Sequence, residues 1–262
     1  MNLKRIMLRV AYDGTDFHGW QFQPGVRTVE GELNNAITLL TGKETEVTGA
    51  SRTDAGVHAM GNVAVFDTEA TVPPERFAQA LNTYLPEDVK VRSSEEVPAD
   101  FHPRKVRCRK VYEYRIYCDR MPDPLKRREC WQVPVKMDVD KMRKAASYLV
   151  GTNDFAGFCS VHTQAESTVR TIYSIDITED APADGGQQIA IRICGNGFLY
   201  NMVRIIAGTL AEVGSGKHEP EWVLEALKSA DRTKSGPTAP PQGLTLCEIT
   251  YFPEAEAVYP WV

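Results

Sequence analysis

Apolar and polar side chains alternate at the start of the chain, and the pattern then changes to helical spacing. Residues 6–11 place Ile, Leu and Val on one face and Met, Arg and Ala on the other, which predicts a strand ending at the turn residues 13–16. Apolar residues at 29, 33, 37 and 40 then fall on one helical face. Thr28 is placed to cap this helix and Gly42 to end it.

The rest of the first half continues as short strands and a second helix. Strands are predicted at residues 45–49, 62–68 and 89–97. The second helix is predicted to open at Pro73 and Pro74 and to carry Phe77, Leu81 and Tyr84. The resulting order is β-α-β-β-α-β, the split βαβ arrangement.

A second series begins with a long strand in which Tyr112, Tyr114, Ile116 and Cys118 share one face. Helices are predicted at residues 138–149, with Gly151 as the stop, at 198–213 and at 221–230; strands are predicted at 168–178, 187–194 and 244–252. We therefore expect an α+β fold of two ferredoxin-like (split β-α-β) halves whose antiparallel sheets join. The expected domains are residues 1–103 and 104–262.

Charge is unevenly distributed along the 262 residues. The net charge is −5, but residues 104–128 hold ten Lys and Arg against three acids, so this segment is +7 and the remainder −12. This uneven distribution of charge is typical of a protein with a basic groove on an otherwise acidic surface. It is equally consistent with a strand whose charged side chains simply face solvent. The six scattered cysteines form no Cys-x-x-Cys pair and are expected to be reduced, and neither a secretory signal nor a membrane span is expected.

The least ordinary stretch is residues 49–59, a loop of small residues that contains Arg52, Asp54, Gly56 and His58. Loops after strands are where rigid scaffolds present functional groups. The structural alternative is a capped turn in which Asp54 bonds local N–H groups and Gly56 supplies a positive φ. Composition alone leaves the two interpretations evenly balanced.

Arg204 and Asn201 lie in a predicted helix that is otherwise apolar nearly all round. A guanidinium there needs an anionic partner, because an unpaired buried charge is costly. The partner is either a structural acid or a catalytic carboxylate such as Asp54, which the pairing would hold ionised. The five histidines show no ligand spacing, so no metal site is expected.

Several motifs together resemble the bacterial tRNA pseudouridine synthase A family. The family's Gly-x-x-Arg-Thr-Asp-x-Gly-Val-His-Ala signature is present at residues 49–59, although Ser51 replaces the usual glycine before Arg52. Lys110 and Val111 stand where arginines are common. The other matches, in the family's order, are residues 12–15, 17–21, 101–102, 112–114, 197–204 and 243–246.

The resemblance implies roles for individual residues. Asp54 would be the catalytic nucleophile, Tyr112 would stack on the target uracil and serve as a possible general base, and Arg204 would form an ion pair with Asp54. Arg52 would assist base flipping and Leu246 would line the pocket. In the basic segment, the residues expected to bind substrate are Arg104, Arg109 and Lys110.

The resemblance also implies a reaction and its setting. Uridines 38–40 of the tRNA anticodon stem-loop would be isomerised in a cleft between the halves, with helices on one side of the joined sheets. The sequence leaves open whether Asp54 adds to C6, attacks C1′ or takes a proton from C2′ to give a glycal. No cofactor, nucleotide or metal is expected, and the enzyme is expected to be a cytoplasmic homodimer that does not bind a membrane.

Two other functions remain open from the residues themselves. A non-catalytic RNA-binding protein would use the same sheet and basic strand, and would not need Asp54. An aspartate-nucleophile phosphotransferase or hydrolase is suggested by Asp13-Gly14-Thr15 and by the Arg-Thr-Asp loop at residues 52–54. It would require magnesium, and no clustered acids are apparent.

Overall fold

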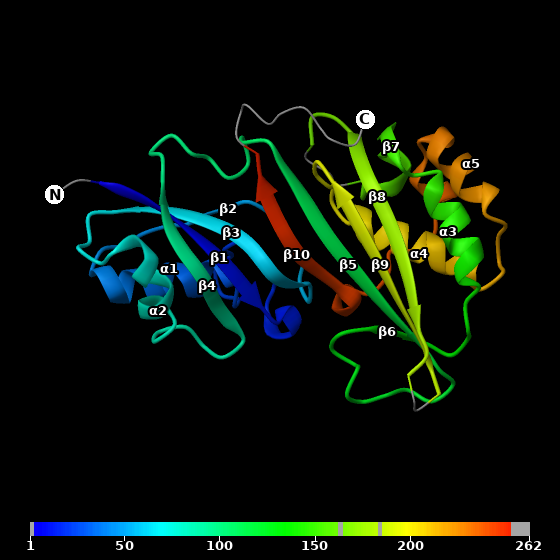
Figure 1. Cartoon of the computed structure of the whole chain (residues 1–262), viewed down its shortest axis with the longest axis horizontal. Helices are drawn as coiled ribbons and strands as arrows, with labels where there is room; N and C mark the ends of the chain where they lie inside the picture. The colour runs from blue at the N-terminus through cyan, green and yellow to red at the C-terminus, as the bar shows by residue number, and fades with distance from the viewer. Residues whose placement is uncertain (1–2, 162–164, 183–184, 253–262) are drawn as a thin grey trace. The chain divides into compact units, whose positions relative to one another are not determined.

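The computed structural model describes residues 3–161, 165–182 and 185–252. These residues form two compact units, unit 1 from residues 3–108 and 246–252, and unit 2 from residues 109–245. Each unit combines a mainly antiparallel sheet with helices (Figure 1). The predicted mixture of helices and strands is therefore confirmed.

Unit 1 is built on a sheet in which β1 lies between β4 and β3 and is antiparallel to both. The short strand β2 pairs with β3, as does β10, and α1 and α2 pack together (Figure 1). The strands are β1 (Lys4–Tyr12), β2 (Thr48–Gly49), β3 (His58–Thr68), β4 (Val89–Val97) and residues 246–251 of β10 (Leu244–Tyr251); the helices are α1 (Val29–Thr41), α2 (Phe77–Leu81) and the 3₁₀ turns η1 (Gly14–Asp16) and η2 (Pro74–Arg76).

The local signals for α1 act as the sequence predicts. The Thr28 hydroxyl accepts from Gly31 N–H, and Gly42 ends the helix in the left-handed region at φ 71°. Leu33 and Ile37 are fully buried, as are Ile6 and Leu8 of β1. The predicted apolar faces of the first strand and first helix are thus both part of the core of unit 1.

Three predictions in this unit are wrong in extent. The strand predicted at residues 62–68 begins four residues earlier, at His58. The predicted strand at residues 45–49 is reduced to Thr48–Gly49, because Val47 N–H bonds the Asn34 side chain instead of a neighbouring strand. The helix predicted from Pro73 to Tyr84 is a 3₁₀ turn followed by the five-residue α2, and Tyr84 is exposed. Asn82 stops α2 by bonding Val91 N–H and C=O with its side chain.

Unit 2 contains a sheet in the order β5-β9-β8-β7, with β6 parallel to β5. Helix α3 packs against α4, α5 and β8 (Figure 1). The strands are β5 (Cys108–Cys118), β6 (Trp131–Val133), β7 (Gly151–Asp154), β8 (Val169–Asp180) and β9 (Gln187–Gly195); the helices are α3 (Val139–Ser147), α4 (Met202–Gly214), α5 (Glu221–Ser229) and the 3₁₀ turns η3 (Ala156–Phe158), η4 (Arg232–Lys234) and η5 (Pro241–Gly243).

The predicted start of the helix at residues 198–213 is wrong. It begins at Met202, because Asn201 lies in the left-handed region at φ 60° and interrupts the turn that precedes it. The helix predicted at 138–149 ends at Ser147, and Gly151, expected as its stop, opens β7 at φ 106° instead. Strands β6 and β7 were not predicted.

All six cysteines are free thiols, as expected, and three of them are buried. Burial raises the pKa of the Cys118 thiol to about 12, so it is packed and unreactive. None of the helices formed by the described residues combines the length and apolar character that crossing a bilayer requires.

Candidate active site

The loop that carries Asp54 in unit 1 is held from both sides by backbone contacts. Trp20 N–H donates to Thr53 O at 3.0 Å, and Ala50 N–H donates to Val63 O of β3 at 2.7 Å. Asp54 O accepts from Val57 N–H, and Gly56 adopts φ 77°, the positive value predicted for this turn. Asp54, which is half-buried, therefore lies at the tight bend of a fixed loop.

A histidine joins the end of this loop to the turn after β1. His58 Nδ1 accepts from Gly14 N–H at 3.0 Å and lies 3.1 Å from Asp13 Oδ1. A Cβ at Gly14 would come within 2.0 Å of Val57 O, so only glycine allows this approach. The Asp-Gly-Thr motif thus has a structural task, because it packs against the Asp54 loop.

Beneath the loop lies a buried polar network. The Tyr12 hydroxyl and the Thr53 hydroxyl are 2.7 Å apart, and Asn62 Nδ2 lies 3.2 Å from the Tyr12 hydroxyl. Asn62 Nδ2 also donates to Ser51 O at 2.9 Å, and Asn62 is fully buried. Buried hydrogen bonds of this kind fix one conformation, since leaving any partner unsatisfied is costly.

Two arginines lie close together here, Arg52 within the loop and Arg104 beside it. Arg104 Nε donates to Gly49 O at 2.7 Å, and burial together with the nearby charge of Arg52 lowers the pKa of Arg104. Arg52 itself is exposed. Unit 1 therefore brings together three of the predicted site residues, Arg52, Asp54 and Arg104, and it also contains Leu246, which is fully buried.

The other predicted site residues belong to unit 2. Tyr112 on β5 is nearly buried and packs edge to face against Phe198, with ring centroids 5.1 Å apart. This contact fixes the plane of the tyrosine ring. Arg109 and Lys110 precede it on the same strand, and Lys110 pairs with Gly195 of β9.

Arg204 on α4 is oriented by neutral oxygens of its own unit. Its Nε donates to Ala239 O at 2.7 Å and its Nη1 donates to Asn201 Oδ1 at 2.8 Å. The segment supplying Ala239 is pressed against α4, where a Cβ at Gly208 would meet Pro237 O at 1.9 Å. The hydrogen bonds to Asn201, the left-handed residue just before α4, and to Ala239 thus orient the Arg204 guanidinium.

Sequence reasoning missed the residues that support the loop. Asn62, Tyr12 and the pairing of His58 with Gly14 were not predicted as a network. A polar Asn inside the otherwise apolar run 62–66 was the available signal for Asn62. No group of three or more His, Cys, Asp and Glu side chains suited to a metal ion occurs in the described part of the chain.

The chain has a mixed α+β fold. Its candidate site presents the Asp54 carboxylate on a loop held by hydrogen bonds, with Arg52 on the loop and Arg104 beside it. The family model described as tRNA pseudouridine synthase matches residues 9–104 and 145–252. The chain belongs to the tRNA pseudouridine synthase family.

Curated relatives match this chain along nearly its whole length. A tRNA pseudouridine synthase A of Thermoanaerobacter sp. (strain X514) is 45% identical over 249 residues, which cover 95% of this chain and all of the relative. The protein of that name from Geobacter sp. (strain M21) is 45% identical over 96% of this chain and 100% of its own. That of Bacillus subtilis (strain 168) is 44% identical over 94% and 99%.

Proposed function

We propose that Asp54 is the nucleophile with which this chain, an isomerase of the tRNA pseudouridine synthase family, converts uridine to pseudouridine in tRNA. Membership of the tRNA pseudouridine synthase family supports the reaction and the substrate. The observation that carries the role of Asp54 is its place at the bend of a loop fixed by Trp20, Ala50 and His58. A nucleophile on a preorganised loop loses little freedom when it reacts.

The reaction leaves the composition of the nucleotide unchanged. The C1′–N1 bond of uridine breaks, the uracil turns within the site, and a C5–C1′ bond forms; C5 then loses its proton and N1 gains one. Asp54 serves as the covalent partner that holds the intermediate until the new bond forms. The detached uracil must stay inside the pocket while it turns, so the pocket has to exclude water and retain the ring.

Tyr112 is proposed to hold the flipped uracil by stacking. Phe198 fixes the plane of the Tyr112 ring, which suits a flat surface for a base. Stacking of a base on an aromatic ring contributes about 1–3 kcal/mol, which offsets part of the cost of extrusion. The Tyr112 hydroxyl is the proposed general base for the C5 proton.

The arginines and Leu246 complete the proposed site. Arg204, aimed by Ala239 O and Asn201 Oδ1, would pair with Asp54 and keep it ionised. Arg52 is an exposed residue of the Asp54 loop and would enter the space that the target base leaves. Leu246 would line the pocket, and the phosphate backbone would be bound by Arg104, Arg109 and Lys110.

The proposal extends to substrate position and assembly. Uridines 38–40 of the anticodon stem-loop, the positions that the family resemblance implies, are the proposed targets. A basic surface that reads RNA shape would tolerate the different sequences around them. The halves, residues 1–103 with the aspartate loop and residues 104–262 with Tyr112 and Arg204, are proposed to be ferredoxin-like with a joined sheet and an active-site cleft between them. We further propose a cytoplasmic homodimer.

Mapping pseudouridine in treated tRNA tests this function. Unmodified tRNA would be incubated with the intact protein, and pseudouridine would be located by carbodiimide labelling and primer extension. The expected result is pseudouridine at one or more of positions 38–40. An absence of pseudouridine in tRNA that is demonstrably bound would overturn the proposed function and favour a non-catalytic RNA-binding protein.

A further inference from the structure

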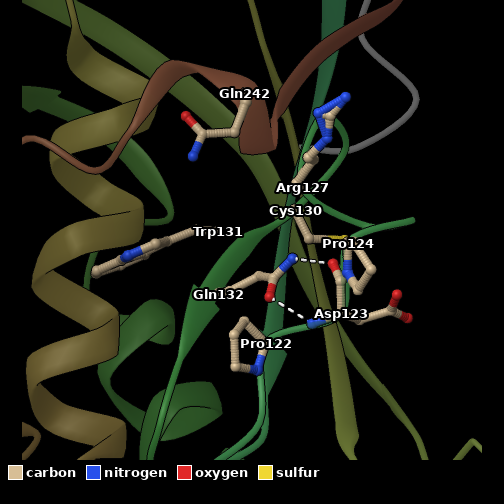
Figure 2. Close-up of a pocket in the computed structure, with 8 residues that line it drawn as sticks. All are labelled: Pro122, Asp123, Pro124, Arg127, Cys130, Trp131, Gln132 and Gln242. Carbon is tan, nitrogen blue, oxygen red and sulfur yellow. Dashed lines mark hydrogen bonds between the residues drawn. The ribbon is translucent and has the colours of Figure 1, made fainter.

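Unit 2 contains a pocket of about 420 Å³ that includes none of the proposed catalytic residues. Figure 2 shows that its side chains come from the loop before β6, from β6 itself and from the η5 turn. The volume lies within the usual range for ligand sites, about 300–1,000 Å³. Its residues combine an aromatic ring, a carboxamide and a guanidinium, namely Trp131, Gln242 and Arg127.

The wall of the pocket is preorganised. Gln132 side-chain Oε1 accepts from Asp123 N–H at 2.8 Å, and its Nε2 donates to Asp123 O (Figure 2). The Trp131 ring packs edge to face on the buried Tyr114, with centroids 6.4 Å apart. Loop and ring are therefore held in place before any ligand arrives, which lowers the entropic cost of binding.

Some polar side chains that line the pocket already have a partner within the described part of the protein, and others have none there. Asp123 already pairs with Lys126 at 2.9 Å, so that carboxylate is neutralised. The side chains of Arg127 and Gln242 form no hydrogen bond or ion pair with any of the described residues. The Arg127 guanidinium and the Gln242 carboxamide can therefore bind a ligand that carries a negative charge and a planar edge of hydrogen-bond donors and acceptors.

We propose that this pocket binds a nucleotide of the RNA substrate, with its base against Trp131 and Gln242 and its phosphate on Arg127. A carboxamide carries a donor and an acceptor side by side, which matches the edge of a base. An aromatic ring supplies the stacking surface and arginine the phosphate contact. The inference rests on the proposed function, because it assumes that the substrate is RNA.

Affinity for unmodified tRNA tests the proposal with matched variants. Gln242→Ala, which removes a base contact, and Arg127→Ala, which removes a phosphate contact, should each raise Kd about tenfold, while kcat at saturating tRNA stays unchanged. Arg120→Ala is the control, because it removes the same charge from an exposed residue of the same loop outside the pocket. Equal effects of Arg127→Ala and Arg120→Ala would overturn the proposal.

A second measurement does not depend on catalysis. Protein labelled with 5-fluorotryptophan would be titrated with AMP and UMP, and the Trp131 signal would be identified from Trp131→Phe. A saturable shift of that signal, lost in Gln242→Ala, is expected; an unmoved signal contradicts the inference, even if the protein isomerises tRNA. A change of molecular mass in the variants, with tRNA affinity intact, would instead assign the pocket to contact between protein chains.

Discussion

The position of Asp54 depends on side chains more than on regular secondary structure. Residues 50–57 belong to no helix or strand, yet the loop is tied to the turn after β1 and to the buried Asn62. Each tie uses a polar group that has little access to water. The loop should therefore be sensitive to single substitutions that remove an acceptor.

His58 provides the clearest test at this scale. Replacing His58 with Ala leaves the buried Gly14 N–H without its acceptor, so the free energy of unfolding should fall by about 1–3 kcal/mol. Isomerisation should slow as well, because the Asp54 loop loses its contact with Gly14. Urea denaturation and single-turnover rates measure the two effects.

His58→Asn is the matched control, since its side-chain oxygen can take the place of Nδ1 as acceptor. This variant should keep most of the stability that His58→Ala loses. If both variants are equally destabilised, the hydrogen bond to Gly14 is not what His58 contributes.

At the scale of elements, the register of β1 on β3 places the network and the loop together. Arg5 lies opposite Asp67, and its Nε and Nη2 donate to the two carboxylate oxygens at 2.8 and 2.7 Å. The hydrogen bonds from Arg5 lower the pKa of Asp67. A one-residue slip would break this pair and turn the core face of β1 outward.

The Arg5–Asp67 pair predicts a defined dependence of stability on pH. Because the folded-state pKa of Asp67 is lowered, its stabilisation is complete above the unfolded-state value of about 3.9 and disappears as pH falls through the folded value. Asp67→Asn should cost roughly 0.5–1 kcal/mol at neutral pH, since both side chains are partly exposed, and the cost should shrink in acid.

Urea denaturation of both proteins between neutral pH and about pH 2 measures this difference. Asp140→Asn is the control, because Asp140 is 91% exposed and its pair with Arg143 should contribute little at any pH. A cost of Asp67→Asn that stays constant across the range would contradict the assignment.

The elements that sequence predicted well are those with a strong repeating pattern. The strand predicted at residues 187–194 (β9) and the cap and stop of α1 follow directly from alternation, Thr28 and Gly42. Strand β7 was missed because its residues Thr152 and Asn153 are polar and give no alternation. The start of α4 was misplaced because Asn201 is left-handed, with its side-chain oxygen accepting from Arg204, and local sequence patterns do not reveal this conformation.

The site could be predicted only in part for the same reason. The Asp54 loop stood out through its composition, whereas its supports come from residues such as Tyr12 and Asn62 that are distant in sequence. Such hydrogen bonds depend on strand register, which local patterns do not determine.

At the scale of the whole molecule, the basic segment lies within a chain of net charge −5. Binding of tRNA should therefore weaken steeply with salt, because phosphate contacts release counterions. Replacing Lys110 with Ala should reduce the slope of log Kd against log salt concentration by about 1. Fluorescence anisotropy of labelled tRNA at several salt concentrations measures the slope.

Lys43→Ala is the control for this measurement, because Lys43 is exposed and already paired with Glu69. Its slope should equal that of the intact protein. Equal slopes for Lys110→Ala and the intact protein would remove Lys110 from the proposed phosphate contacts.

The most direct test of the account is tritium release from tRNA labelled at C5 of uridine, compared between the intact protein, Asp54→Asn and the control Asp16→Asn. Asp16 is an exposed acid of the neighbouring η1 turn. The intact protein and Asp16→Asn should release tritium, and Asp54→Asn should be slower by at least about a thousandfold while it still binds tRNA. Release by Asp54→Asn at the rate of the intact protein would contradict the assignment of Asp54 as the nucleophile.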